Sequence, residues 1–289
     1  MAFVYVIISI ICSVSVSLIL KTISKKNTNL LPSLFFSYIT TLLACIFFFP
    51  QNISTKLLES SAILISLGIL FPVGFISMSK SIYIIGIAKS EVIQRSSIFI
   101  SLMISFVVYN EVLTKSKMFA IFLAPFAILL MITNKQSHNI KNHEHKNLFS
   151  LKYEKIWILI LLLSYGTVDI LLKELSKKEL VINILSVSFL ISAISLLFYL
   201  ALTKNIKTIT LSSLKSGLLI GSLNFCNIYN YIKAHKEMPN DPSVIFILMN
   251  FGVILLGLIL GIKLFGERVT MKNYIGIAIT TLIIISITN

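Results

Sequence analysis

Five ionisable side chains lie within or at the edges of long apolar runs of the sequence, where a charge is costly and is usually retained for a function. They are Lys80, Glu91, Arg95, Asp169 and Lys173. Arg95 can meet a carboxylate or phosphate through two parallel hydrogen bonds. Glu91, four residues earlier, lies on the same helical face and can hold Arg95 in place. The alternative is an ion pair that only conceals both charges within one helix.

Asp169 and Lys173 have the same spacing, and Lys173 can extend its amine to water at the interface. An interfacial ion pair is therefore one interpretation of these two residues. The other is that Asp169, a carboxylate about two helical turns inside its run, relays protons. Lys80 stands several turns from either end of its run, close to Tyr83. Because a buried Lys needs a polar partner, we expect Lys80 to face a cavity.

Amide and hydroxyl side chains form a third candidate group. Asn224, Asn227 and Tyr231 recur at i, i+3 and i+7 and therefore share one face of a helix. A polar face with an aromatic ring is typical of a small-molecule site, and hydrogen bonding between membrane helices is the alternative. Gln94 and Asn250 take matching places when the two halves described below are aligned. We include both among the expected substrate-binding residues.

Long apolar runs must position these side chains. The chain has 289 residues, of which 56% are hydrophobic and 12% charged, and its mean hydropathy is +0.94. A water-soluble domain of this size could not bury so much apolar surface, and lipid requires each segment to satisfy its own backbone hydrogen bonds. Within the ninth run, Gly252, Gly257 and Gly261 are expected to allow close helix packing. We predict ten transmembrane helices, at residues 3–20, 31–49, 61–85, 91–109, 118–133, 156–172, 182–202, 214–232, 243–262 and 274–288.

Two short patterns recur in the same order in the two halves of the chain. Residues 20–26 and 172–178 both read LKxxSKK, and the segments beginning at Glu111 and Glu267 both read ExxT. Each half holds five predicted helices, an odd number, so the second copy must enter the membrane from the opposite side. The predicted fold class is all-α integral membrane with two inverted five-helix repeats. The expected domains are the repeats at 1–133 and 156–289 and a soluble linker at 134–155.

Ten spans in two halves, each with an ExxT segment before its last helix, resemble the drug/metabolite transporter (DMT) superfamily and, within it, the EamA-type transporters. Residues 264–270 (LFGERVT) followed by 274–277 (YIGI) are similar to the most recognisable segment of that family. Residues 109–114 (YNEVLT) form a looser counterpart in the first half. The resemblance implies an exporter or importer of metabolites. It implies no particular substrate, because the family handles amino acids, sugars, nucleotide derivatives and drugs.

We expect a secondary transporter that works without ATP and moves a small polar metabolite, such as an amino acid or related zwitterion or anion, by alternating access. A proton gradient or simple exchange could drive it. The alternative within transport is a proton-coupled exporter of cationic or amphipathic drugs, with Glu91 and Asp169 as counter-ions. The alternative outside transport is a membrane scaffold. The partners expected are therefore a small-molecule substrate and the lipid bilayer.

Other classes of protein find no support in the residues present. The net charge of +14 comes mostly from Lys residues scattered over short loops, which set membrane topology rather than bind nucleic acid. No nucleophile–base set, P-loop or GxGxxG motif indicates an enzyme, and we expect neither a cofactor nor a metal. The excess of Lys and Arg in odd-numbered loops predicts that those loops are cytoplasmic and both termini outside. Short loops and a Lys- and Ile-rich composition suggest a bacterial inner membrane.

Overall fold

A computed structural model describes most of the chain, and within the described residues its regular structure is helical. The described residues are 1–25, 30–49, 60–85, 87–109, 112, 114–132, 148–203, 208–265 and 270–288. The helices are α1 Ala2–Lys25, α2 Leu30–Phe48, α4 Ser61–Ile85, α5 Ile87–Ser96, α6 Ile98–Val107, α7 Lys115–Ile132, α8 Leu148–Ser176, α9 Val181–Leu202, α10 Leu211–Glu237, α11 Pro242–Phe265 and α12 Met271–Thr288. These helices confirm the predicted all-α membrane fold, with α5 and α6 together in place of the predicted fourth span.

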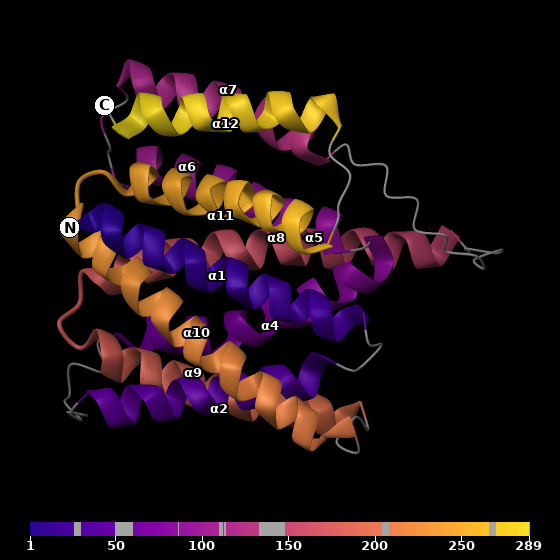
Figure 1. The fold of residues 1–289 in the computed structure, drawn as a ribbon. Helices are drawn as coiled ribbons and strands as arrows, with labels where there is room; N and C mark the ends of the chain where they lie inside the picture. Colours follow the sequence, from indigo (N-terminus) through magenta and orange to yellow (C-terminus); the bar gives the residue numbers. More distant parts are fainter. Residues whose placement is uncertain are drawn as a thin grey trace.

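Apolar composition accounts for the helices, because in lipid a helix satisfies its backbone groups within one segment. Among the described helices, α1, α2, α4, α8 and α9 each contain a stretch long and apolar enough to cross a membrane. Shorter apolar stretches lie at Ile93–Val107, Pro242–Gly257 and Tyr274–Ile283. Figure 1 shows the helices running roughly parallel, with both chain termini at the same end of the bundle, as an even number of crossings requires.

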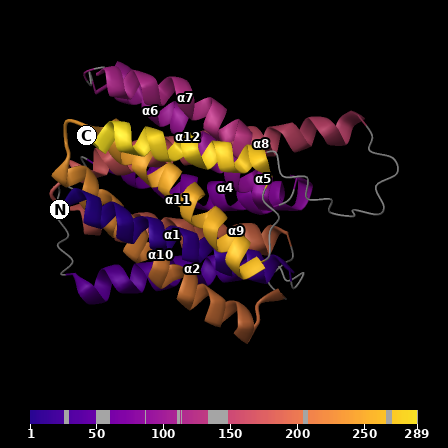
Figure 2. The ribbon, with the colours of Figure 1, turned by 45° about the horizontal axis from the view of Figure 1, so that its top comes forward.

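The packing of the helices repeats itself when the two halves of the chain are exchanged. The first helix of each half packs along the third helix of the other half, so α1 lies on α10 and α8 lies on α4. The second helices, α2 and α9, pack on each other, and so do the last helices, α7 and α12. Figures 1 and 2 both show α7 beside α12 at one edge of the bundle. This pattern is that of two inverted five-helix repeats.

The predicted fourth span is divided at Ser97 into α5 and α6. The Ser97 N–H donates to the Gln94 carbonyl at 3.2 Å, a bond to the third residue back that tightens the turn. Serine hydroxyls compete with the backbone for hydrogen bonds, and Ser96 and Ser97 are adjacent here. The division therefore lies directly after Gln94 and Arg95, two of the predicted site residues.

The sixth span is longer than predicted. Helix α8 begins at Leu148, inside the segment expected to be a soluble linker, and contains 29 residues. At about 1.5 Å per residue it is roughly 43 Å long, whereas the hydrocarbon core of a bilayer is about 30 Å thick. The polar first turns can therefore extend beyond the membrane, and in Figures 1 and 2 this end of α8 projects past the neighbouring helices. The assignment of domains remains a prediction.

Close helix packing occurs on α10, and on α11 it occurs at Gly252, where a Cβ atom would lie 2.4 Å from Ile10 Cδ1 of α1. A Cβ atom at Gly221 would lie 2.5 Å from the Ser37 carbonyl oxygen of α2, and Gly217 meets α2 one turn earlier. The expectation for Gly257 is wrong, because a Cβ atom there would meet no atom of the described residues within 4 Å. The spacing Gly-x-x-x-Gly occurs in both helices, and only the neighbouring helix decides whether the small residues matter.

This difference yields a test of the α2–α10 contact. We expect Gly221→Val to lower the stability of the purified protein by about 1–3 kcal/mol, because the added atoms would collide with the backbone of α2. Thermal unfolding in detergent measures the effect. Gly257→Val is the matched control and should leave the unfolding temperature nearly unchanged. Equal losses from the two substitutions would show that the close approach at Gly221 is not significant for stability.

Candidate functional site

A cavity of about 130 Å³ lies in the middle of the bundle, with walls from both repeats. It has room for on the order of ten water molecules, and a polar wall is needed to hold them. Helices α1, α2, α4 and α5 of the first repeat and α8, α9, α10 and α11 of the second contribute to its lining. The polar lining consists of Ser13, Ser17, Tyr38, Thr41, Gln94, Arg95, Ser164, Tyr165, Asp169, Asn224, Asn227, Tyr231 and Asn250.

The structure brings seven of the ten sequence-predicted site residues together at this cavity. They come from α5, α8, α10 and α11, which are far apart in the sequence. They are Gln94, Arg95, Asp169, Asn224, Asn227, Tyr231 and Asn250. All seven therefore line the same cavity. Their role in binding a substrate remains a prediction.

Lys80 does not belong to this group, and its expected cavity position is wrong. Its side chain is exposed, and Met78 is the last residue of α4 that lines the cavity. Because two residues turn a helix by about 200°, Lys80 faces away from the side that Met78 occupies. The side chains of Tyr83 and Glu91 lie outside the described residues, so their predicted roles remain predictions.

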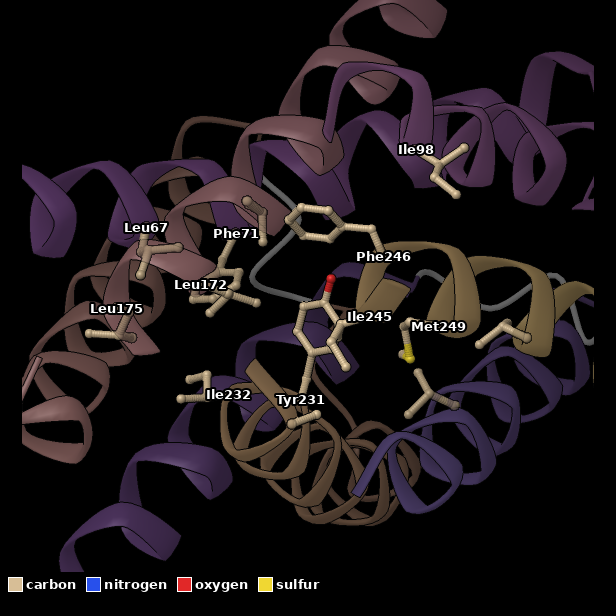
Figure 3. Packing of buried hydrophobic residues seen from close by; sticks show 14 of the residues in the cluster. Leu67, Phe71, Ile98, Leu172, Leu175, Tyr231, Ile232, Ile245, Phe246 and Met249 are labelled. Atoms are coloured by element: carbon tan, nitrogen blue, oxygen red, sulfur yellow. The ribbon is translucent and has the colours of Figure 1, made fainter. Parts of the chain in front are cut away.

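Asp169 on α8 is surrounded by hydrogen-bond donors from three other helices. The Tyr231 hydroxyl lies 3.4 Å from Oδ1, and the Ser101 hydroxyl lies 3.5 Å from Oδ2. The Asn250 side chain also interacts with this carboxylate. Both distances are long for bonds to a carboxylate, which leaves capacity for a stronger partner. Figure 3 shows the Tyr231 hydroxyl directed away from α10, between Leu172 and Met249.

Arg95 lies in the last turn of α5 and is the cation among the described residues that line the cavity. One guanidinium nitrogen donates to the Ser13 hydroxyl on α1 at 3.0 Å. The guanidinium also interacts electrostatically with Asp169 and with the ring hydroxyls of Tyr165 and Tyr231. A cation from the first repeat and an anion from the second therefore share one polar space, where each compensates part of the cost of burying the other.

The amides of α10 contribute both to packing and to the cavity. The Ser9 hydroxyl of α1 donates to the backbone carbonyl of Asn227 at 3.0 Å and also contacts the side-chain oxygen of that residue. The interpretation of Asn227 as a helix–helix contact is thus supported alongside its place in the cavity wall. Asn250 donates to the Phe246 carbonyl at 3.0 Å, which fixes its amide beside Asp169.

Beyond Tyr231, toward the end of the bundle that holds the termini, the space is closed by buried side chains. The Lys173 amine donates to the Pro239 carbonyl at 2.9 Å and is 1% exposed, so it does not extend to water as one interpretation proposed. The His235 ring is fully buried and packs edge-on against both Tyr231 and Phe246. These contacts hold Tyr231 in place from the side opposite the cavity.

At the same end, charged side chains connect the two repeats. Lys117, near the start of α7, forms an ion pair with Asp241, which precedes α11, at an N–O distance of 2.6 Å. Lys177, which follows α8, places its amine 4.5 Å from the centre of the Tyr109 ring. Both contacts join a first-repeat residue to a second-repeat residue. We call these two contacts the inter-repeat clamp.

Sequence reasoning missed the contribution of the first two helices to the cavity. Ser9, Ser13 and Ser17 recur every four residues along α1, and this stripe of hydroxyls was the available signal. Tyr38 and Thr41 on α2 carried no comparable signal, because isolated hydroxyls are common in membrane helices and often bond their own backbone. Thr41 does this with the Ser37 carbonyl at 2.8 Å.

Two comparisons place the chain among known proteins. The model of the EamA-like transporter family matches residues 153–289, a range that includes the predicted second repeat at 156–289. The chain is also 34% identical over 281 residues to an uncharacterized protein of Haemophilus influenzae, and the alignment covers 94% of this chain and 92% of that protein. The relative has no described activity, so the cavity itself must supply the argument for a substrate.

The inter-repeat clamp can be tested by a double-mutant cycle. We expect Lys117→Met and Asp241→Asn each to lower the free energy of unfolding, with a coupling of about 1 kcal/mol because Asp241 is partly exposed to solvent. The double variant should then be only slightly less stable than the less stable of the two single variants. Chemical unfolding in detergent provides the measurement, and strictly additive losses would contradict an interaction between the two residues.

Proposed function

We propose that this chain is a secondary transporter of a small metabolite that carries an anionic group, such as an amino acid or a related zwitterion or anion. The chain belongs to the EamA-like transporter family of the DMT superfamily. The observation that carries the proposal is the meeting of Arg95 and Asp169, from opposite repeats, in one central cavity. Transporters built from inverted repeats commonly bind their substrates at such a place.

Arg95 is the residue that would recognise the anionic group. Its guanidinium can form two parallel hydrogen bonds with a carboxylate, and Ser13 orients it by accepting one bond at 3.0 Å. Gln94 on the same helix and Asn224 and Asn250 from the second repeat add neutral donors and acceptors around that position. A substrate of this kind would compete with Asp169 for the positive charge of Arg95.

Asp169 is the residue that would carry the coupling proton. When a substrate anion occupies Arg95, the Asp169 carboxylate loses part of the positive field that stabilises its charge, and taking up a proton becomes easier. Release of the substrate restores that field and favours release of the proton. Substrate and proton would then travel together through the same cavity, and no nucleotide is required.

Alternating access fits the arrangement of the helices. The two repeats enclose the cavity between them, and the turn at Ser97 divides the helix that bears Arg95. A small movement of one repeat against the other would open one end and close the other. The inter-repeat clamp would have to separate in that movement. We further propose, from the excess of Lys and Arg in odd-numbered loops, that both termini lie outside the cytoplasm. The short loops and the Lys- and Ile-rich composition support a bacterial inner membrane.

The presence of Asp169 in the cavity also favours a second candidate function, the export of cationic drugs. In that case the carboxylate would bind the cation, and Arg95 would oppose it. The two functions therefore differ in the charge of the transported molecule. Arg95 would attract an anionic substrate and repel a cationic one.

Transport by purified protein in liposomes distinguishes these functions. We expect counterflow of amino acids or organic anions in the wild type and a loss of at least about tenfold in Arg95→Gln, because a buried charge-assisted contact is worth roughly 1.5–3 kcal/mol. Lys80→Gln also removes a cation from a membrane helix but lies outside the cavity, so its rate should match the wild type. Faster transport of cations in Arg95→Gln, without any anion transport, would favour the drug exporter.

The proton-carrying role of Asp169 has a separate test. We expect Asp169→Asn to keep exchange of substrate across the liposome membrane while losing the acceleration that a pH gradient produces, because the amide cannot take up a proton. Ser101→Ala removes a hydrogen-bond donor to Asp169 without removing the carboxylate and serves as the control, with its response to the gradient retained. Acceleration of the same size in Asp169→Asn would exclude this residue as the proton carrier.

A further inference from the structure

One side of the central cavity is an arc of aromatic rings, which recognition of a charge does not explain. The rings belong to Tyr38, Phe71, Phe75, Tyr165 and Phe189, from α2, α4, α8 and α9. Phe71 and Phe189 stack with their centroids 5.3 Å apart and an angle of 14° between their planes. Tyr38 contacts Phe189 and Phe75, with centroids 6.4 and 6.0 Å apart. The rings thus form one continuous surface.

The aromatic arc adjoins the charged part of the cavity at Tyr165. The Tyr165 ring lies edge-on to Phe75, with centroids 6.5 Å apart, and so completes the arc. Its hydroxyl lies within electrostatic range of both Arg95 and Asp169. A single small molecule could therefore reach the charged part with one end and the aromatic arc with the other.

Tyr38 adds a polar group to the arc. Its side chain is 2% exposed, and among the described residues its hydroxyl has no hydrogen-bond partner. A buried hydroxyl without a partner destabilises the protein unless something else supplies the bond. Since Tyr38 lines the cavity, a polar substituent on a bound molecule is a suitable partner.

We propose that the substrate is a small aromatic carboxylate, with its carboxylate at Arg95, its ring against the aromatic arc and a polar ring substituent bonded to Tyr38. This inference rests on the proposed function, because it assumes that the cavity is the transport site. It restricts the wider class of zwitterions and anions to those with a planar apolar body. A compact polar molecule would leave the arc in contact with water, and an aliphatic body would forgo the ring–ring contacts.

The experiment uses four probes, tyrosine, phenylalanine, leucine and 4-hydroxyphenylacetate, as competitors in counterflow and as ligands that raise the unfolding temperature of the purified protein. We expect phenylalanine to bind about fivefold more tightly than leucine because of ring–ring contacts. Tyrosine should bind about tenfold more tightly than phenylalanine because of the additional hydrogen bond. Binding of 4-hydroxyphenylacetate as tightly as tyrosine would place the recognition in the carboxylate and ring. Much weaker binding would show that the ammonium is recognised as well, which supports the aromatic carboxylate and narrows it to aromatic amino acids.

Tyr38→Phe is the decisive variant, because removal of an unpartnered hydroxyl should leave the fold intact. It should abolish the preference for tyrosine over phenylalanine while keeping the preference for phenylalanine over leucine. Tyr199→Phe, the same change in α9 outside the cavity lining, is the matched control and should keep both preferences.

Two results would overturn the inference alone: transport of short polar zwitterions with no aromatic preference, or an unchanged tyrosine preference in Tyr38→Phe. Failure of the wild-type protein to transport any amino acid or organic anion would instead contradict the proposed function. In that case binding of tyrosine, detected by the rise in unfolding temperature, still decides whether the cavity recognises an aromatic carboxylate.

Discussion

A charge in the middle of a bilayer is tolerated only where protein or water surrounds it, and this constraint organises the whole molecule. Arg95 and Asp169 belong to different repeats, and neither could lie at this depth facing lipid without a large loss of hydration. Their shared cavity resolves the problem for both at once. The polar space therefore forms where the two repeats pack against each other. Each repeat contributes one of the two charges, Arg95 from the first and Asp169 from the second.

Small residues make the packing around this space possible. Where α10 crosses α2, glycine lets the two backbones approach, and hydroxyl side chains form the contacts that hydrocarbon cannot supply. Ser33 and Ser216, for example, lie 2.8 Å apart across the same pair of helices. In a membrane such contacts replace the hydrophobic effect as the source of specificity between helices. The large aromatic rings are then free to line the cavity instead of filling the contacts between helices.

The fold could be predicted from the sequence to a large extent, because a bilayer permits few solutions. Long apolar runs located the helices, and the recurrence of LKxxSKK and ExxT indicated the inverted repeats. The site was harder to predict. Arg95 and Asp169 were identifiable because charges are rare in apolar runs, but the same argument wrongly placed Lys80 in the cavity. Depth in a helix does not specify which face a side chain occupies, and only the neighbours of α4 decide that. Tyr38 and the other aromatic rings could not be distinguished from ordinary core residues until the helices that face one another were known.

The inter-repeat clamp has a further consequence, because the two repeats are alike in shape but not in charge. When the repeats are aligned on their ExxT segments, the position of Lys117 in the first corresponds to Asn273 in the second. Asn273 carries no charge, so it cannot form at the opposite end of the bundle the ion pair that Lys117 forms with Asp241. A duplicated unit would by itself produce a molecule indifferent to direction. Under the proposed alternating access, the loss of that equivalence would give the two faces unequal energies, and the unloaded protein would have a preferred resting orientation even where the concentrations on both sides are the same.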